Sequence, residues 1–305
     1  MKKILLVADQ PGWIFDDHCH EIQKRLKGEF DIQVAYRRNH IQKIAEEKDL
    51  VYVLDPMAMK SWAPPNKTIM GLRCEFMFLQ HPQGAKGLYE KGLAGFGSSI
   101  KNKCCIFHVV NQNQIDVFKP IVLDKPLLLV PHGVNEEIFD ASKYKKVEND
   151  VLTISTSGRG SPNKGFPMVK KACDDLGIRY ISAQFGNKKV PKEEMPEFYN
   201  KVDAHVCMSR HEGLSNPIME AGAMGVPVIS TKCGASEEMI VDKENGLLID
   251  RTEEALKEAL AFMRDNKEKR LEMGQKFYEE IMKNWTWKSR IDGFRKMFNL
   301  FFNGK

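Results

Sequence analysis

Short apolar runs alternate with amphipathic segments along this chain, and this alternation restricts the possible folds more than any other feature. It is typical of βα units joined into a mostly parallel sheet. A helix is expected over Ile14–Leu26, where "FDDHCHEIQKRL" gives an apolar stripe, and Gly12 lies at the turn that precedes it. The strands expected in the first half are Lys3–Ala8, Ile32–Tyr36, Leu50–Leu54, Thr68–Leu72, Cys104–Val110 and Leu127–Val130.

A second alternating set follows, with strands expected at "VLTISTSG", "IRYISAQ", "AHVCMS", "PVIST" and "GLLID". The 305 residues are long enough for two domains of ordinary size. The sequence therefore predicts a Rossmann-like domain over 1–135, a polar linker over 136–150, a second Rossmann-like domain over 151–284, and a helix over 285–305 that packs back on the first domain.

The aromatic stripe of the last helix needs a surface to bury against, and we interpret it as core. Its members are Trp285, Trp287, Phe294, Phe298 and Phe301. Because lysine and arginine alternate with these rings, a peripheral contact with a membrane surface is the alternative.

Charge and cysteine content restrict partners and compartment only weakly. The net charge of +5 comes from 46 basic and 41 acidic residues scattered along the chain, so the sequence argues against nucleic acid as a partner. Seven cysteines without C-x-x-C spacing indicate reduced thiols. No apolar run reaches the roughly 20 residues that span a bilayer. We therefore expect a cytoplasmic protein, at most peripheral at the membrane.

The stretch "SRHEGLSNPIMEAGAMGVPVIS" contains two glutamates, Glu212 and Glu220, around a predicted helix start. Pro217 suits the first turn and Ser215 or Asn216 suits the N-cap. A helix start attracts an anion such as a diphosphate, and a carboxylate inside the helix suits neutral hydroxyls such as a ribose diol. From helix physics alone, an ordinary capping arrangement with one exposed glutamate is equally compatible.

Two cations, Arg159 and Lys164, lie in "TSGRGSPNKGF", between an apolar strand and a helix. This places them at the carboxyl end of a sheet, where open α/β folds bind ligands. Taken singly, each cation is more simply a solvated surface residue.

The wider segment "EGLSNPIMEAGAMGVPVIST" resembles the E-x7-E signature of the retaining GT-B glycosyltransferases of family 4, the group 1 transferases related to glycogen synthase. The segments "LLLVPHGVNEEIF", "SGRGSPNKGF" and "NGLLID" follow the family's order. The resemblance is strong from about Leu127 to Asp250 and before that rests on strand order and Gly12. It implies two Rossmann-like domains that face each other across a cleft.

The resemblance also implies an activity: transfer of a sugar from a UDP-, GDP- or ADP-sugar to a hydroxyl acceptor, with retention and without a metal or cofactor. Glu212 would act near the transferred sugar and Glu220 on the ribose. The remaining donor-binding residues implied are Arg159, Lys164, Gly213, Leu214, Ser215, Asn216 and Gly12.

The first half departs from the family pattern. "QPGW" has one glycine where many relatives have a pair, and Gly71 stands where many have a histidine. His81 or His108 could replace that histidine, although either is more simply a structural residue. The acceptor (a glycan, a lipid-linked or a small molecule) and the oligomeric state are not indicated. The alternatives are a non-catalytic nucleotide-sugar binding protein and a transferase acting on modified nucleic acid.

Overall fold

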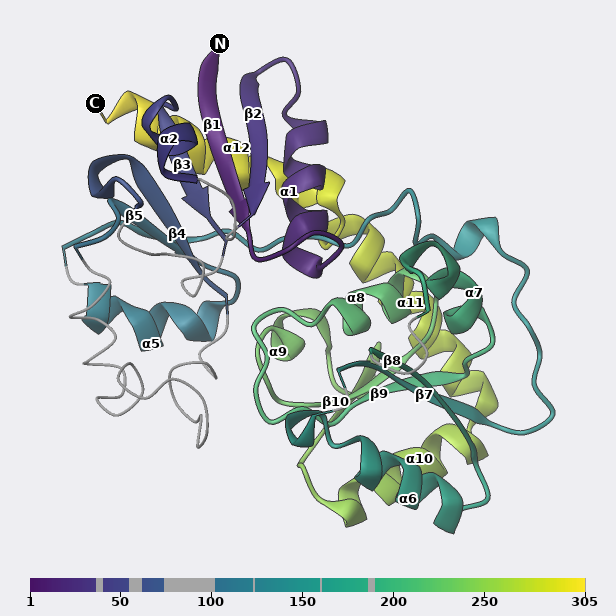
Figure 1. The fold of residues 1–305 in the computed structure, drawn as a ribbon. Helices are drawn as coiled ribbons and strands as arrows, with labels where there is room; N and C mark the ends of the chain where they lie inside the picture. Colours follow the sequence, from purple (N-terminus) through teal and green to yellow (C-terminus); the bar gives the residue numbers. More distant parts are fainter. Residues whose placement is uncertain are drawn as a thin grey trace. The chain divides into compact units, whose positions relative to one another are not determined.

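The chain folds into two compact units, each built on a parallel sheet (Figure 1). The computed structural model describes residues 1–36, 41–54, 62–73, 102–122, 124–159, 161–185 and 190–304. The first unit comprises Met1–His132 and Arg290–Lys305, and the second comprises Gly133–Ser289. The prediction of two Rossmann-like sheets is confirmed.

The first unit contains a six-stranded sheet in the order β2-β1-β3-β4-β5-β6, all parallel. Its strands are β1 (Lys2–Ala8), β2 (Phe30–Tyr36), β3 (Leu50–Val53), β4 (Thr68–Leu72), β5 (Ile106–Val109) and β6 (Leu127–Leu129). The described helices that follow these strands are α1 (Ile14–Arg25), α2 (Ile41–Glu46) and α5 (Gln112–Val122). Because both faces of a parallel sheet are covered, its strands are continuously apolar. Ile4 through Ala8 of the central β1 are fully buried for this reason.

The last helix, α12 (Trp287–Asn303), supplies aromatic core to the first unit. Phe298 packs edge-on against Phe30 and Tyr52, and Arg295 pairs with Glu29. All five aromatic residues of the predicted stripe are buried. None of the helices in the described ranges combines the length and apolarity needed to cross a membrane.

The second unit contains a five-stranded parallel sheet in the order β11-β10-β9-β7-β8. Its strands are β7 (Thr153–Arg159), β8 (Arg179–Phe185), β9 (Ala204–Cys207), β10 (Val228–Thr231) and β11 (Gly246–Ile249). The direction of winding reverses between β7 and β9. In open α/β sheets, ligands bind outside the carboxyl ends of the strands at such a reversal. The loops that follow β7 and β9 carry two of the predicted site residues, Lys164 and Glu212.

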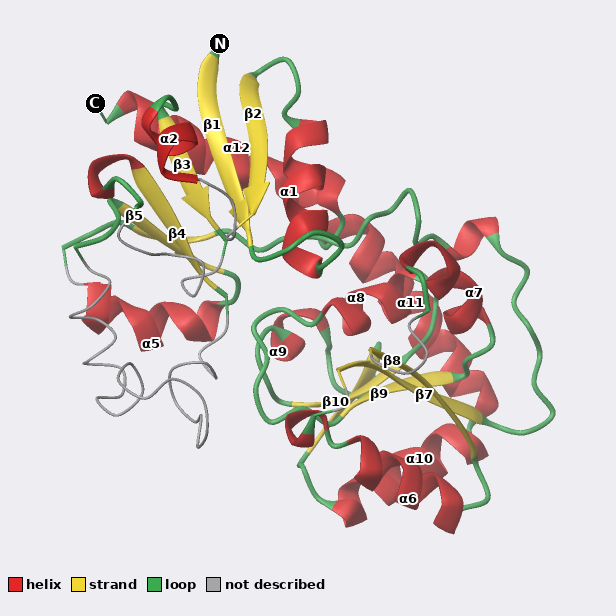
Figure 2. Ribbon diagram, in the orientation of Figure 1, coloured by secondary structure: helices red, strands yellow, loops and turns green. Residues whose placement is uncertain are grey.

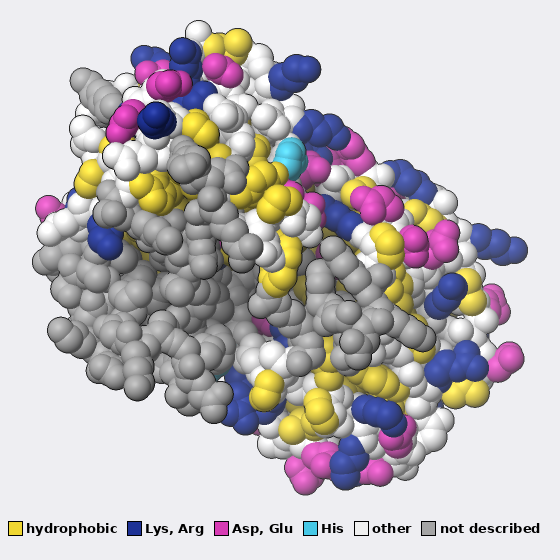
Figure 3. Space-filling view, viewed as in Figure 1, with side chains coloured by type: hydrophobic (Ala, Val, Ile, Leu, Met, Phe, Trp, Pro, Cys, Tyr) yellow, Lys and Arg dark blue, Asp and Glu magenta, His cyan; other side chains and the backbone are white. Residues whose placement is uncertain are grey.

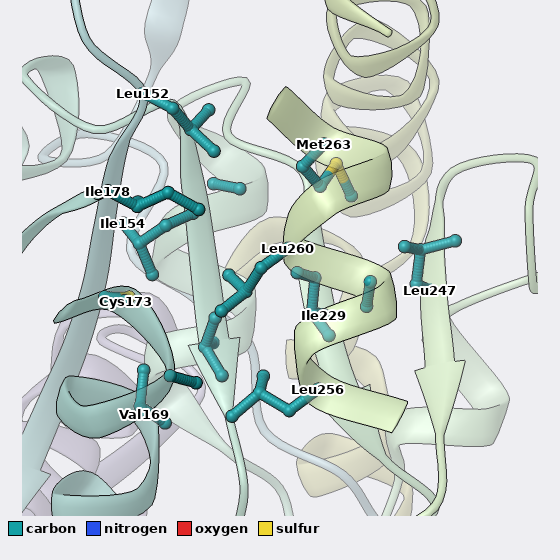
Figure 4. Packing of buried hydrophobic residues seen from close by; sticks show 14 of the residues in the cluster. Leu152, Ile154, Val169, Cys173, Ile178, Ile229, Leu247, Leu256, Leu260 and Met263 are labelled. Atoms are coloured by element: carbon teal, nitrogen blue, oxygen red, sulfur yellow. The ribbon is translucent and has the colours of Figure 1, made fainter. Parts of the chain in front are cut away.

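Helices cover both faces of this second sheet (Figure 2). One face carries α6 (Phe166–Asp175) and α10 (Glu253–Asp265), and the other carries α7 (Met195–Asn200), α8 (Asn216–Ala223) and α11 (Lys267–Asn284). The core between sheet and helices includes Ile154, Ile229 and Leu260, all fully buried (Figure 4). Each such side chain contributes roughly 1.5–3 kcal/mol through removal of apolar surface from water.

Two glycines allow α11 to approach the site-bearing helix α8 and the turn after it. A Cβ on Gly222 of α8 would come within 2.6 Å of Ile281 and 2.7 Å of Phe277 on α11. A Cβ on Gly274 of α11 would lie 2.4 Å from the carbonyl oxygen of Gly225. The position of α8 therefore depends on the absence of two side chains.

Replacement of Gly274 by alanine tests this packing. Helix propensity alone favours alanine by about 1 kcal/mol. We expect the opposite sign, a destabilisation of about 1–3 kcal/mol, because the new methyl group meets a backbone oxygen that cannot rotate away. Urea unfolding checks the change, with Leu271→Ala on the exposed face of the same helix as the control; Leu271 is 54% exposed. A Gly274→Ala protein as stable as the natural one would contradict the packing argument.

Candidate functional site

The loops after β7 and β9 are held together by one asparagine and one glycine. Asn163 Nδ2 donates to the carbonyl oxygen of His211 at 3.0 Å, and Asn163 Oδ1 accepts from the amide of His211 at 3.2 Å. Gly165 adopts φ +68°, and a Cβ there would lie 2.9 Å from the carbonyl oxygen of Met208. The two segments that carry the predicted cation and carboxylate thus touch through backbone.

At this junction Lys164 and Glu212 form an ion pair. Lys164 Nζ donates to Glu212 Oε1, which also accepts from Ser209 Oγ at 2.6 Å. Their side chains are only 18% and 14% exposed. Burial lowers the pKa of Lys164, but the neighbouring Glu212 carboxylate more than offsets it, so the pKa lies above its ordinary value. Lys164 is therefore an ammonium ion at neutral pH.

The turn after β10 packs against the segment between Glu212 and α8. Gly234 adopts φ +57°, and a Cβ there would lie 2.4 Å from the carbonyl oxygen of Gly213 and 2.6 Å from that of Glu212. The amide of Ala235 donates to Gly213 O at 3.0 Å. Gly213, Leu214 and Ser215 are buried, whereas Asn216 is partly exposed. These contacts fix the peptide groups that lead into α8.

The predicted side-chain cap of α8 is wrong. Ser215 occupies the N-cap position with extended backbone, but its hydroxyl makes no hydrogen bond to a helix amide. Asn216 is the first helical residue, so it does not serve as the cap either. Within the described ranges, Ser215 Oγ has no hydrogen-bond partner at all. The first N–H groups of α8 therefore lack the hydroxyl acceptor that Ser215 was expected to supply.

Glu220, on α8, is positioned by a buried tyrosine. Tyr199 Oη donates to Glu220 Oε2 at 3.1 Å and lies 2.8 Å from Ser157 Oγ on β7. Tyr199 is fully buried, and burial, with the charge of Glu220, raises its pKa well above its ordinary value. The phenol thus keeps its proton and acts as a donor to the carboxylate.

Two thiols lie close to the Lys164–Glu212 pair. Cys207 ends β9 and Cys233 follows β10, and both are buried. A hydrogen bond between them lowers the pKa of Cys207 and raises that of Cys233. Both are free cysteines, as expected.

Sequence reasoning did not find the side chains that hold the two glutamates. Ser209 and Asn163 lie close to predicted residues, but no motif marks them. Tyr199 belongs to a different helix from Glu220, and no fixed spacing relates the two. The only signal that could identify Tyr199 is a buried phenol close to a predicted carboxylate, and this closeness is visible only once the fold is known.

The remaining predicted residues are Arg159, Gly12, His108 and His81. Arg159 ends β7, and its side chain is outside the described part of the structure. Gly12 belongs to the first unit, where it adopts φ +70° and its amide donates to Asp16 Oδ2 at 2.8 Å. His108 is fully buried in β5, and burial lowers its pKa to about 3. His81 lies outside the described residues.

In the described ranges, no group of three or more histidine, cysteine, aspartate and glutamate side chains could hold a metal ion. On the face drawn in Figure 3, basic and acidic side chains are interspersed over the described surface.

Comparison with known proteins connects the second unit to a family. Residues 182–280 match the model of the family described as glycosyl transferases group 1. A probable sucrose-phosphate synthase from Thermosipho melanesiensis is 28% identical over 57% of this chain and 47% of its own. An uncharacterised glycosyltransferase from Methanocaldococcus jannaschii is 32% identical over 56% of this chain and 53% of its own. The chain thus spans about half the length of these curated relatives.

Solved structures match over nearly the whole chain. A sucrose-phosphate synthase from Thermosynechococcus elongatus has a TM-score of 0.79 at 12% identity, with 100% of both chains covered. HepE from Anabaena, solved with UDP and glucose, has a TM-score of 0.74 at 13% identity, with 98% of this chain and 100% of its own covered. At such low identity the likeness concerns the fold, which is that of the GT-B proteins.

The Lys164–Glu212 pair generates a stability prediction. Lys164→Met and Glu212→Gln should each destabilise by about 1–3 kcal/mol, because each leaves a mostly buried partner charge without its counter-ion. The double variant should recover much of this loss, so that a double-mutant cycle shows strong coupling. Urea unfolding at pH 7 measures all four proteins. Because the Lys164 pKa is raised, the stabilisation that depends on its charge is present at neutral pH and is lost as the pH rises through that raised pKa.

The exposed pair Lys170–Asp174 is the matched control for this cycle. Their side chains are 59% and 57% exposed. Lys170→Met and Asp174→Asn should show little or no coupling, because solvent screens exposed charges. Equal coupling in the two cycles would contradict the assignment of Lys164 and Glu212 as a buried pair.

Proposed function

We propose, from the premise that this chain belongs to the group 1 glycosyl transferases, that it moves a sugar from a nucleoside diphosphate sugar to a hydroxyl acceptor with retention of configuration. One observation carries the proposal. Lys164 pairs with Glu212 in the segment before α8, and Glu220 lies on α8 itself, at the reversal of the second sheet, where such folds bind nucleotides. The arrangement offers positive groups for a diphosphate and a separate carboxylate for hydroxyl groups.

The donor's phosphates bind at the start of α8. The positive end of the α8 dipole attracts an anion, and Lys164 is paired with Glu212 in the segment that leads into α8. An ammonium has three N–H donors, so Lys164 can serve Glu212 and a phosphate oxygen at once. Arg159, at the end of the neighbouring β7, is the second proposed cation. The peptide groups of Gly213 to Asn216 complete the contact with phosphate and sugar.

Glu220 binds the ribose. It lies one turn into α8 and is partly exposed, so a diol can reach it. A carboxylate offers about four acceptor sites, so Glu220 can accept from the two ribose hydroxyls while Tyr199 donates to Oε2. Tyr199 thereby sets the direction of the carboxylate and is a positioning residue.

The reaction breaks the bond between the anomeric carbon and the diphosphate oxygen. The acceptor hydroxyl forms the new bond on the same face, and its proton goes to the departing phosphate oxygen. The protein supplies charges at fixed positions. Lys164 stabilises the negative charge that develops on the leaving group, and Glu212, held by Ser209, faces the positive charge that develops on the sugar ring. This scheme requires no metal and no protein nucleophile.

The donor base is left open among uridine, guanosine and adenosine. HepE is solved with UDP and with UDP-glucose, which favours UDP as the first probe. A mannosyltransferase of Mycolicibacterium smegmatis, 29% identical over 40% of this chain, is described as GDP-mannose-dependent, so GDP is tested with it.

A thermal-shift titration with UDP, GDP and ADP, with CMP for comparison, tests the proposal. A ligand that binds only the folded protein stabilises it by about 2.7 kcal/mol at a hundred times its dissociation constant. One diphosphate should raise the melting temperature in the presence of EDTA, and Glu220→Ala should lose the effect. Hydrolysis of the matching sugar donor, lost in Glu212→Ala, then tests catalysis. Binding without hydrolysis or transfer would instead indicate a nucleotide-sugar binding protein, and absence of any nucleotide effect would overturn the assignment.

The Tyr199 contact gives a separate prediction. Tyr199→Phe removes only the hydroxyl that directs Glu220, so the KM for the donor should rise about tenfold, equivalent to roughly 1.5 kcal/mol, the lower end for one hydrogen bond to a charged group. The kcat should change less. Tyr180→Phe is the matched control, because Tyr180 Oη lies 2.6 Å from Thr156 Oγ1 on the same sheet and makes no contact with Glu220. Equal KM values in the two variants would contradict a positioning role.

A further inference from the structure

The first unit contains a buried positive charge that no acidic side chain of the described ranges pairs with directly. Arg73 follows β4 at the carboxyl edge of the sheet and is only 8% exposed. Its Nη1 lies 2.5 Å from His18 Nδ1, and its Nη2 donates to Tyr52 Oη at 3.3 Å. No aspartate or glutamate of the described ranges lies within ion-pair distance of its guanidinium.

The polar groups that contact Arg73 are neutral. His18 Nδ1 accepts from the guanidinium, so its proton lies on Nε2. Tyr52 Oη accepts from Arg73 and lies 2.6 Å from His108 Nε2. Burial, and then the charge of Arg73, lowers the pKa of His108 to about 3, which makes it a neutral acceptor for the phenol proton. The surroundings therefore orient the guanidinium without balancing its charge.

The other buried arginine of the described ranges, Arg270, has an acidic partner. Arg270 Nη1 donates to the carbonyl oxygen of Met263, and its Nη2 lies 3.9 Å from an Asp203 carboxylate oxygen. A buried charge is ordinarily paired in this way, because its hydration is lost. Arg73 instead stands with its Cζ 5.4 Å from the ring centroid of Phe15.

Two acidic residues lie in the same region. Asp9, Asp16 and Arg73 all act electrostatically on the Cys19 thiol. Asp16 already accepts from the amide of Gly12 and from Tyr36 Oη. Asp9 Oδ1 is buried and has no hydrogen-bond partner in the described part of the chain. A ligand that carries both an anionic group and hydroxyl groups suits this mixture, because hydroxyls can donate to Asp9.

We propose that this edge of the first unit binds a phosphate group carried by the acceptor, with Arg73 as the counter-ion. A guanidinium has five N–H donors in a rigid fork that matches phosphate oxygens. The described residues accept from only two of its nitrogens, and Nε has no partner among them. That the phosphate belongs to the acceptor rests on the proposed function. Phosphate binding at Arg73 itself can be measured without any sugar transfer.

The test is a phosphate titration of the full chain by thermal shift, at constant ionic strength against chloride. It is run with and without saturating UDP, so that phosphate entering the nucleotide site of the second unit is recognised. Phosphate should raise the melting temperature of the natural protein in both conditions. Arg73→Met should weaken phosphate binding at least tenfold, and Arg73→Lys should also weaken it, because lysine lacks the fork and burial lowers its pKa.

Arg295→Met is the matched control. It removes the same charge from the same unit, but Arg295 is 31% exposed and paired with Glu29, so phosphate binding should be unchanged. Retention of the natural phosphate effect in Arg73→Met, or its equal loss in Arg295→Met, overturns the proposal. If UDP has no effect while the Arg73-dependent phosphate effect persists, the proposed function fails and the phosphate site stands. The opposite result leaves the donor site and rejects the phosphate site.

The source of the phosphate is then distinguished with two probes. Glucose 6-phosphate is compared with glucose, and vesicles containing phosphatidylinositol are compared with phosphatidylcholine vesicles. Arg73-dependent binding of the sugar phosphate assigns a free phosphorylated acceptor, and Arg73-dependent vesicle binding assigns a lipid headgroup. If neither probe binds in an Arg73-dependent manner, the proposal that the acceptor carries this phosphate is rejected.

Discussion

The ion pair between Lys164 and Glu212 is the interaction on which the candidate site depends. It joins the loop after β7 to the loop after β9, at the point where the second sheet reverses its winding. Both side chains are mostly buried, so neither charge is tolerated without the other. Asn163 and Gly165 bring the two backbones close enough for the pair to form. The cation for the leaving group and the carboxylate for the sugar are therefore one structural unit.

The arrangement of strands and the position of the α8 start could be predicted because both depend on short stretches of sequence. Strands and helices have different apolar periods, and Pro217 followed by Gly225 marks the two ends of a short helix. β4 was predicted with its observed bounds, and the other expected strands of the first unit differ at their ends by up to two residues. Strand ends are set by hydrogen bonds to the neighbouring strands, and these bonds cannot be inferred from the sequence of one strand.

The side chains that position Glu212 and Glu220 could not be predicted because their contacts cross the fold. Tyr199 reaches Glu220 only because α7 and α8 cover the same face of the sheet. The expected cap at Ser215 failed for a similar reason: the turn after β10 supports this segment from below, and the local preference of serine does not decide where its hydroxyl points. Likewise Arg73, His18 and Tyr52 come from three separate segments of the first unit.

The two units solve the problem of a buried cation in opposite ways. In the second unit, Glu212 raises the pKa of Lys164 despite burial, so the charge persists and the net charge of the pair is close to zero. Lys164 and Ser209 both donate hydrogen bonds to Glu212, so the Glu212 carboxylate repels a nearby diphosphate less. In the first unit, Arg73 needs no such help, because a guanidinium stays protonated without a counter-ion. Lysine at that position would lose its proton on burial. An arginine among neutral partners therefore keeps a full charge for an anionic ligand. A buried lysine could keep its charge only if it formed an ion pair with a carboxylate.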